Sequence, residues 1–134
     1  MSGKSVFADT SGFLALMDAD DSFHKKAAQS WADYSVENYT LWTSDYVRLE
    51  SWALIQRRLG SQAALDFSDL ILPACSILHI GEEGFSSSVN QWRIARRRNL
   101  SLVDITSFYA MRKSHIDRAF SFDAHFAEEG FLLP

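Results

Sequence analysis

The chain has 134 residues, of which 47% are hydrophobic and 13% aromatic, and its formal net charge is −4. This length and composition fit one domain with a sizeable buried core. The single cysteine, Cys75, excludes an internal disulfide and a zinc site built from several cysteines, and it suits a reducing compartment. The first apolar stretch is interrupted by Asp9 and is too short for a signal peptide or a membrane span, so we expect a cytoplasmic protein without a membrane segment.

Short strand-like runs alternate with helical patterns along the chain. The strand-like runs cover residues 5–8, 39–42, 76–80 and 119–122, with residues 131–133 as a candidate fifth. The helical patterns cover residues 10–17, 22–34, 45–59, 61–72, 85–98 and 104–114. Such alternation predicts an α/β fold over residues 1–134, in which a parallel sheet of four to five strands lies between two layers of helices.

Local signals predict where several of these helices begin, end and face. Ser22 is a candidate N-cap, and Asn99 is a candidate for the left-handed conformation that follows a helix. Phe85, Val89 and Trp92 form an apolar stripe, which is typical of a helix that packs on the core through that side.

Four acidic residues occupy positions where predicted elements meet or where burial is expected. Asp9 and Asp123 each close a strand-like run, and Asp104 opens a helical pattern. In open α/β sheets, ligands bind in the crevice beyond the carboxyl ends of the strands, so side chains at such junctions can converge. Clustered carboxylates repel one another unless a cation holds them, and oxygen ligands in this number suit Mg²⁺ or Mn²⁺.

The fourth acid, Glu50, lies in a helical pattern whose apolar residues are distributed on nearly all sides. A helix of that kind is expected to be buried. A buried glutamate costs several kcal/mol unless it is paired or binds a metal. Two interpretations remain open from the residues alone: Glu50 belongs to the acidic cluster, or it forms a structural ion pair with Arg57.

Four blocks of the sequence, in order, resemble the PIN-domain family of metal-dependent ribonucleases, and most closely its VapC-like toxins. Each block carries one of the acids: residues 6–16 (VFADTSGFLAL), 43–55 (TSDYVRLESWALI), 100–108 (LSLVDITSF) and 119–131 (AFSFDAHFAEEGF). The resemblance spans nearly the whole chain. The family often has Gly-Ile before its fourth strand, where this chain has Ser114, His115 and Ile116.

The resemblance implies a fold, an activity and a set of partners. By resemblance, Asp9, Glu50, Asp104 and Asp123 bind Mg²⁺ or Mn²⁺ and catalyse the cleavage of RNA phosphodiester bonds. It also implies a toxin that is neutralised by a cognate antitoxin protein, and we expect a homodimer. A stand-alone PIN nuclease in RNA processing, a PIN-like binding module without catalysis and, more remotely, a phosphatase of another α/β family are the alternatives.

Hydroxyl and guanidinium groups are the candidates for contacts with the RNA. Thr10, Ser11 and Ser107 follow the acids closely and are candidates for hydrogen bonds to a phosphate or a metal-bound water; a helix cap or a turn is the alternative role for each. The arginine run is the candidate for the RNA backbone, with a solvated helix face as the alternative; it comprises Arg93, Arg96 and Arg97.

The four histidines are scattered along the sequence and suggest no ligand set. Only His125, two residues after Asp123, is near one of the acids, and the neighbouring Phe126 favours a packing role for it.

Overall fold

The computed structural model describes residues 4–134, and its centre is a parallel sheet with the strand order β3-β2-β1-β4. The strands are β1 (Ser5–Ala8), β2 (Thr40–Ser44), β3 (Cys75–Leu78) and β4 (Ala119–Phe120). In the register, β1 lies in the middle and pairs Phe7 with both Trp42 of β2 and Ala119 of β4. The predicted parallel sheet is therefore confirmed, with β1 and its terminal Asp9 at its centre.

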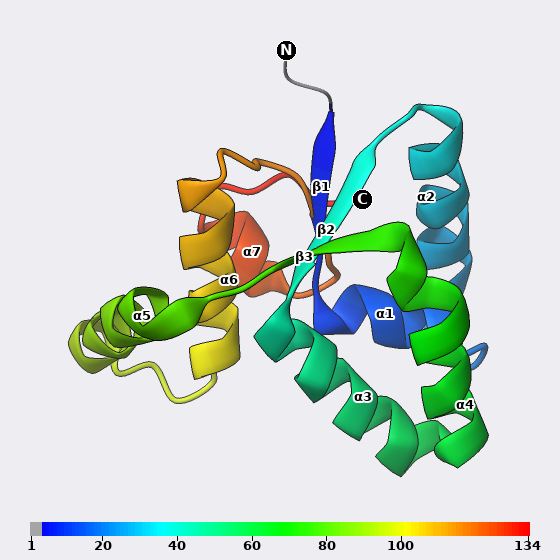
Figure 1. The fold of residues 1–134 in the computed structure, drawn as a ribbon, viewed down its shortest axis with the longest axis horizontal. Helices are drawn as coiled ribbons and strands as arrows, with labels where there is room; N and C mark the ends of the chain where they lie inside the picture. The colour runs from blue at the N-terminus through cyan, green and yellow to red at the C-terminus, as the bar shows by residue number, and fades with distance from the viewer. Residues whose placement is uncertain (1–3) are drawn as a thin grey trace.

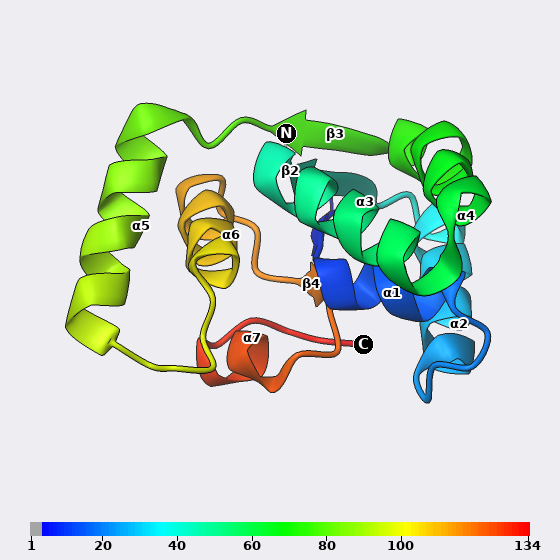
Figure 2. The same cartoon turned by 90° about the horizontal axis from the view of Figure 1, so that it is seen from below.

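Helices cover both faces of this sheet, as Figures 1 and 2 show. On one side lie α1 (Thr10–Met17), α2 (His24–Val36), α3 (Asp45–Leu59) and α4 (Ser61–Asp66). On the other side lie α5 (Gly81–Ala95), α6 (Leu102–Lys113) and α7 (Ala124–Glu128). After α4 the chain continues through a π-helical turn, Phe67–Ile71, and a 3₁₀ turn, Leu72–Ala74. The predicted three-layer arrangement is confirmed.

The core is built largely from aromatic rings that are contributed by strands and helices alike. Phe7, Phe13, Phe67 and Phe120 are fully buried, and the Phe13 and Phe67 rings meet edge to face with centroids 5.0 Å apart. Within residues 4–134, no helix combines the length and the apolar character needed to cross a bilayer.

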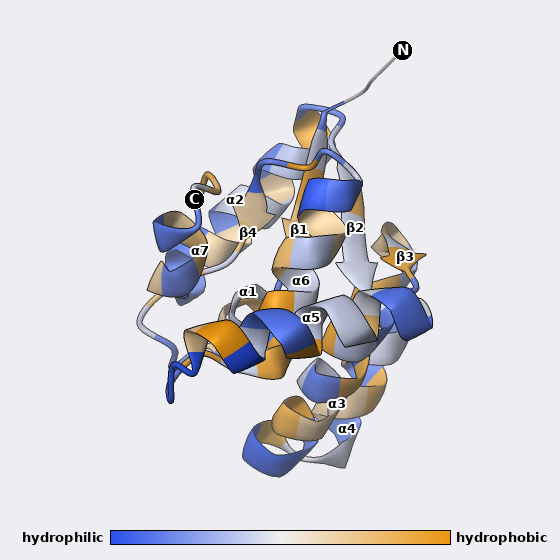
Figure 3. Ribbon diagram, turned by 90° about the vertical axis from the view of Figure 1, so that its left-hand side faces the viewer, coloured by the Kyte–Doolittle hydropathy of each residue, from blue (hydrophilic) through white to orange (hydrophobic). Residues whose placement is uncertain are grey.

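The prediction for the inward face of α5 is wrong. Phe85 and Trp92 are 41% and 43% exposed, whereas Gly84 and Ser88 are buried. Small residues let α5 approach α6 closely, since a Cβ at Gly84 would lie 2.7 Å from the Tyr109 ring. Figure 3, in which α5 lies nearest the viewer, shows hydrophobic and hydrophilic segments alternating along this helix.

The last strands are shorter than the sequence predicts. β4 ends at Phe120, because Ser121 already turns its hydroxyl to the polar groups beyond the sheet. The candidate fifth strand at residues 131–133 is reduced to one isolated bridge, between Arg118 and Leu132.

Three predicted helix ends are displaced by a few residues. Ser22 does not cap α2, since Phe23 holds the cap position and its N–H donates to Asp21 Oδ1 at 2.8 Å. The left-handed residue after α5 is Arg96, with φ 45°, rather than Asn99. α6 begins at Leu102 with Ser101 as its N-cap, so Asp104 lies within the first turn instead of opening the helix.

Gly12 allows the start of α1 to lie directly against β4. A Cβ at this position would overlap the carbonyl oxygen of Phe120 and would lie 2.7 Å from Cδ2 of its ring. The close approach also brings Ser11 within hydrogen-bond reach of the chain that follows β4. The Phe122 N–H accordingly donates to Ser11 Oγ at 2.9 Å.

We expect Gly12→Ala to destabilise the protein by about 2 kcal/mol or more, because overpacking a rigid backbone contact typically costs about 1–3 kcal/mol. Urea unfolding measures this change. Ser86→Ala, which places the same side chain on an exposed position of α5, should stay within about 0.5 kcal/mol of the wild type. Equal stability of the two variants would contradict the close packing of α1 on β4.

Candidate active site

Asp9 lies where β1 ends and α1 begins, and it is 2% exposed. Its Oδ2 accepts hydrogen bonds from the hydroxyls of Ser11 at 2.9 Å and Ser121 at 3.1 Å, and from the Ser11 N–H at 3.3 Å. Burial raises the pKa of Asp9 to about 6, although these hydrogen bonds act in the opposite direction. The sequence prediction that Asp9 stands at a strand end is confirmed.

Glu50 is held by α1 rather than by an arginine. Its Oε1 accepts a 2.7 Å hydrogen bond from Thr10 Oγ1, which in turn accepts one from Ser51 Oγ at 3.1 Å. Among residues 4–134, no ion pair joins Glu50 to Arg57, so the structural ion pair is not formed.

The prediction that α3 is buried on nearly all sides is also wrong. Only Val47, Ser51 and Ile55 of this helix are buried, whereas Leu49 is 70% exposed and Glu50 is half-buried. The apolar residues of α3 outnumber those that the core can cover, so part of its apolar surface remains open to solvent.

Asp104 shows that the acids share one location. Its backbone N–H donates to the Ser101 hydroxyl at 3.0 Å, and its side chain is buried at the start of α6. Burial, together with the negative charges of Asp9, Asp123 and Glu50, raises the pKa of Asp104 to about 7. Carboxylates from β1, α3, α6 and the β4–α7 connection therefore act electrostatically on one another.

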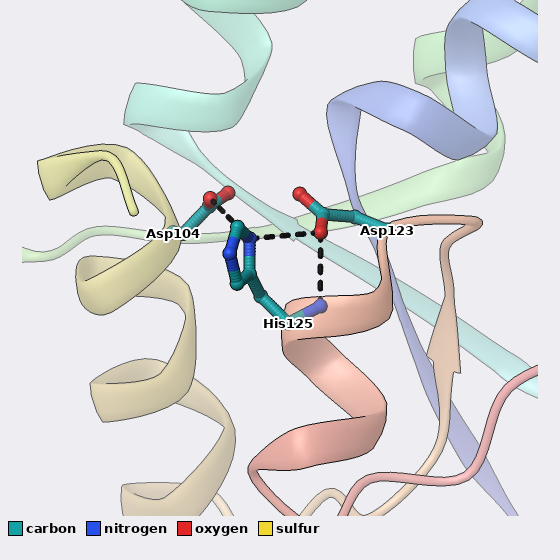
Figure 4. A group of neighbouring side chains, drawn as sticks. All are labelled: Asp104, Asp123 and His125. Carbon is teal, nitrogen blue, oxygen red and sulfur yellow. Dashed lines mark hydrogen bonds and ion pairs between the residues drawn. The ribbon is translucent and has the colours of Figure 1, made fainter. Parts of the chain in front are cut away.

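Asp123 and His125 complete the site at the start of α7 (Figure 4). Asp123 Oδ1 accepts the His125 N–H at 2.9 Å and caps the helix. The imidazole Nδ1 lies 2.9 Å from the same Asp123 oxygen and 4.0 Å from Asp104 Oδ2. One ligand atom from each of the three residues lies within 4.8 Å of the others. The expected packing role of His125 is incomplete, since its largely buried ring also faces two of the acids.

Two buried atoms of this site lack a hydrogen-bond partner among the described residues: Asp9 Oδ1 and His125 Nδ1. The imidazole nitrogen is within ion-pair distance of Asp123, but it lacks the alignment that a hydrogen bond requires. Buried polar atoms are nearly always satisfied, and a bound water or ion is a common partner for those that lack one in the protein. The donor set, which combines carboxylates with one imidazole, fits a divalent cation.

Ser121 is a member of the site that the sequence interpretation missed. Its hydroxyl donates to Asp9 Oδ2 and accepts the Asp123 N–H, both at 3.1 Å, so it connects the two acids at the strand ends. A signal was present, because side chains two residues apart in an extended segment face the same side. Ser121 and Asp123 have that spacing.

The other predicted contact residues lie outside this cluster or are bonded elsewhere. Ser107 donates to Val103 O at 3.1 Å within α6. The arginines lie at the exposed end of α5: Arg93 donates to Asn90, Arg96 adopts the left-handed conformation, and Arg97 pairs with Glu128 at 3.0 Å.

Comparisons with known proteins agree with this architecture. Residues 6–132 match the family model of the PIN domain. The 23S rRNA-specific endonuclease VapC20 of Mycobacterium tuberculosis is 33% identical over 128 residues, with 95% of both chains covered.

Two solved structures show the same fold. The crystal structure of M. tuberculosis VapC20, described as a sarcin-ricin loop cleaving toxin, superposes with a TM-score of 0.85 at 32% identity, and 95% of this chain and 96% of that chain are covered. FitAcB from Neisseria gonorrhoeae has a TM-score of 0.67 at 12% identity, covers 96% of this chain and 95% of its own, and shows the likeness of the fold alone. The chain belongs to the PIN-domain family.

Proposed function

We propose that this chain is a Mg²⁺- or Mn²⁺-dependent endoribonuclease, the toxin of a VapC-type toxin–antitoxin pair. The observation that carries the proposal is the group of Asp104, Asp123 and His125, whose ligand atoms lie within 4.8 Å of one another, with Asp9 and Glu50 near enough to raise the pKa of Asp104. The similarity to VapC20, a protein named as an endonuclease and a toxin, supports the same conclusion.

The residues of the site fit a divalent cation. Asp9, Glu50, Asp104 and Asp123 would hold it through hard oxygen ligands, and the unpartnered Asp9 Oδ1 is an acceptor without another role in the described structure. When bound, such an ion polarises a phosphate and lowers the pKa of a coordinated water. No serine, threonine or cysteine nucleophile is required for hydrolysis of this kind.

The hydroxyl groups near the acids act as positioning groups in this proposal. Thr10 Oγ1 donates to Glu50, and Ser11 Oγ donates to Asp9, so each hydroxyl fixes the orientation of one carboxylate. A phosphate contact by either hydroxyl requires the loss of that hydrogen bond. Ser107 is one helical turn from Asp104 and supports the same helix face, while its hydroxyl bonds the α6 backbone.

The same site weighs against a PIN-like module without catalysis. A binding scaffold gains nothing from acids that destabilise one another's charged form, and burial adds to that cost. The choice between a toxin and a stand-alone nuclease rests on the similarity to VapC20, which is described as a toxin.

We further propose an antitoxin and a second copy of the chain as protein partners, in a cytoplasmic protein of one domain. Exposed apolar side chains support a protein partner: Leu49 of α3 and Phe85 of α5 line a groove of about 330 Å³ beside Glu50. The wall of this groove is almost entirely apolar, which is typical of a surface that a partner covers.

Cleavage should depend on the metal and on Asp9. We expect the purified protein to cleave 23S rRNA, the RNA named for the VapC20 relative, with Mg²⁺ or Mn²⁺ present and to stop in EDTA. Asp9→Asn should lower the rate by at least about 100-fold while the fold is retained, because one charged ligand is lost. Electrophoresis of end-labelled RNA fragments measures the rate. Undiminished cleavage by Asp9→Asn would refute the proposal.

The metal-free protein should become less stable as the pH rises from 6 to 8. The folded pKa of Asp104, about 7, is above the ordinary value of 3.8, so the folded state holds a proton that the unfolded chain releases. The contribution of this proton to the free energy of unfolding is therefore complete below pH 4 and is lost as the pH rises through 7.

Asp104→Asn tests this directly, because the amide cannot ionise. At pH 8 in EDTA we expect it to unfold at a higher urea concentration than the wild type, by an amount on the order of 1 to a few kcal/mol. The difference between the two proteins should shrink at pH 6. A variant that is less stable than the wild type at pH 8 would contradict the electrostatic interpretation.

The arginines at the end of α5 should bind the RNA backbone. In an Asp9→Asn background, Arg96→Glu with Arg97→Glu should weaken binding and flatten the dependence of log Kd on log salt by about 1.4, since each of two lost single-stranded phosphate contacts contributes about 0.7. Fluorescence anisotropy over a salt series measures this slope. Arg57→Glu with Arg58→Glu makes the same charge change on exposed positions of α3 and serves as the control. Equal slopes in both variants would assign the α5 arginines to another role.

A further inference from the structure

His125 stands out because its largely buried imidazole lies beside two acids. The ring lies at the N-terminal end of α7, opposite the first turn of α6, and Figure 4 shows it between Asp104 and Asp123. The side chain is 13% exposed, and its Nδ1 is the nitrogen that faces both carboxylates.

We propose that His125 supplies a nitrogen ligand to the metal centre through Nδ1, beside the carboxylates of Asp104 and Asp123. The inference rests on the proposed function, because it assumes that the acids bind a cation. It adds an imidazole to a site that is otherwise built of carboxylates.

The geometry fits coordination of one ion by three residues. Ligand atoms at about 2.0–2.4 Å from an ion lie at most about 4–5 Å from one another. The three candidate atoms of Asp104, Asp123 and His125 lie within 4.8 Å of one another. An ion among them would also separate Nδ1 from Asp123 Oδ1, which now lie 2.9 Å apart.

The position of His125 is fixed by the packing of the residue that follows it. The next residue, Phe126, is fully buried and meets Phe108 of α6 edge to face, with ring centroids 4.9 Å apart. Asp123 Oδ1 accepts the His125 N–H and fixes the first turn of α7. The ring is thereby held opposite Asp104, although neither contact involves the imidazole itself, so the imidazole remains available as a ligand.

A histidine used only as an ion-pair partner is the alternative. An imidazolium would aim an N–H at an acid, whereas Nδ1 has no aligned hydrogen bond within the described residues. A ligating Nδ1 instead presents its lone pair to the ion and keeps its proton on Nε2.

This ligand set predicts a preference among metals. Mg²⁺ is bound mainly through oxygen, whereas first-row transition ions such as Mn²⁺ accept imidazole more readily. Loss of His125 should therefore weaken Mn²⁺ binding more than Mg²⁺ binding.

Pulsed electron paramagnetic resonance of the Mn²⁺-loaded protein tests the assignment without any measurement of activity. A directly bound imidazole gives a ¹⁴N coupling in the Mn²⁺ spectrum. We expect this coupling in the wild type and its loss in His125→Asn, together with a Mn²⁺ affinity that is lower by about 10-fold or more. Mg²⁺, measured by its competition with Mn²⁺, should lose less affinity.

His115→Asn is the matched control. His115 is exposed at the end of α6 and has φ 56°, a conformation that asparagine adopts readily. It should keep the ¹⁴N coupling and the affinity of the wild type. Circular dichroism checks that both variants are folded.

The outcomes separate this inference from the proposed function. A wild-type protein that binds Mn²⁺ without a ¹⁴N coupling overturns the role of His125 and leaves the nuclease proposal intact. A coupling that persists in His125→Asn also overturns it. A wild-type protein that binds no Mn²⁺ or Mg²⁺ overturns both.

Discussion

The burial of the Asp9 carboxylate is the constraint on which the rest of the site depends. An ionised carboxylate away from water is costly unless it is hydrogen-bonded or bound to a cation. Only one of the two Asp9 carboxylate oxygens is hydrogen-bonded. Oδ2 accepts hydrogen bonds from Ser11 and Ser121, while Oδ1 has no partner among the described residues. Because β1 is an inner strand, Asp9 lies where the start of α1 and the segment after β4 come together, and the fold concentrates negative charge where a cation can bind.

Serine and threonine hydroxyls fix the orientation of the clustered carboxylates. Ser121 connects Asp9 to the backbone of Asp123, and Thr10 connects Glu50 on α3 to the start of α1. The bonds to Asp9 and Glu50 orient these carboxylates and link elements that are distant in the sequence, whereas the bond to the Asp123 N–H is local. These hydrogen bonds hold the acids in place despite their mutual repulsion. The repulsion lowers the stability of the metal-free protein, and a bound ion would remove that cost.

The sequence predicted the features that follow from local patterns, and it failed where tertiary packing decides. The alternation of strands and helices was sufficient for the parallel sheet and for Asp9 at the end of β1, whereas Asp123 lies beyond the end of β4, as the N-cap of α7. The prediction that the apolar stripe of α5 packs on the core was wrong, because Gly84 and Ser88 permit a closer contact with α6 than Phe85 would. His125 and Ser121 were missed because their contacts with Asp104 and Asp9 join residues far apart in the chain, although both lie two residues from Asp123.

The site also draws residues from elements on both faces of the sheet. Asp9 and Glu50 belong to β1 and to α3, whereas Asp104, Asp123 and His125 belong to the α6 and α7 side of the sheet. A helix as short as α7, with five residues, is not stable alone and depends on the contact between Phe126 and Phe108. A cation held by both groups would add a second connection between them, so metal binding would stabilise the docking of α7 as well as relieve the repulsion. In that case the same ion would complete the site and fix the helix that carries part of it.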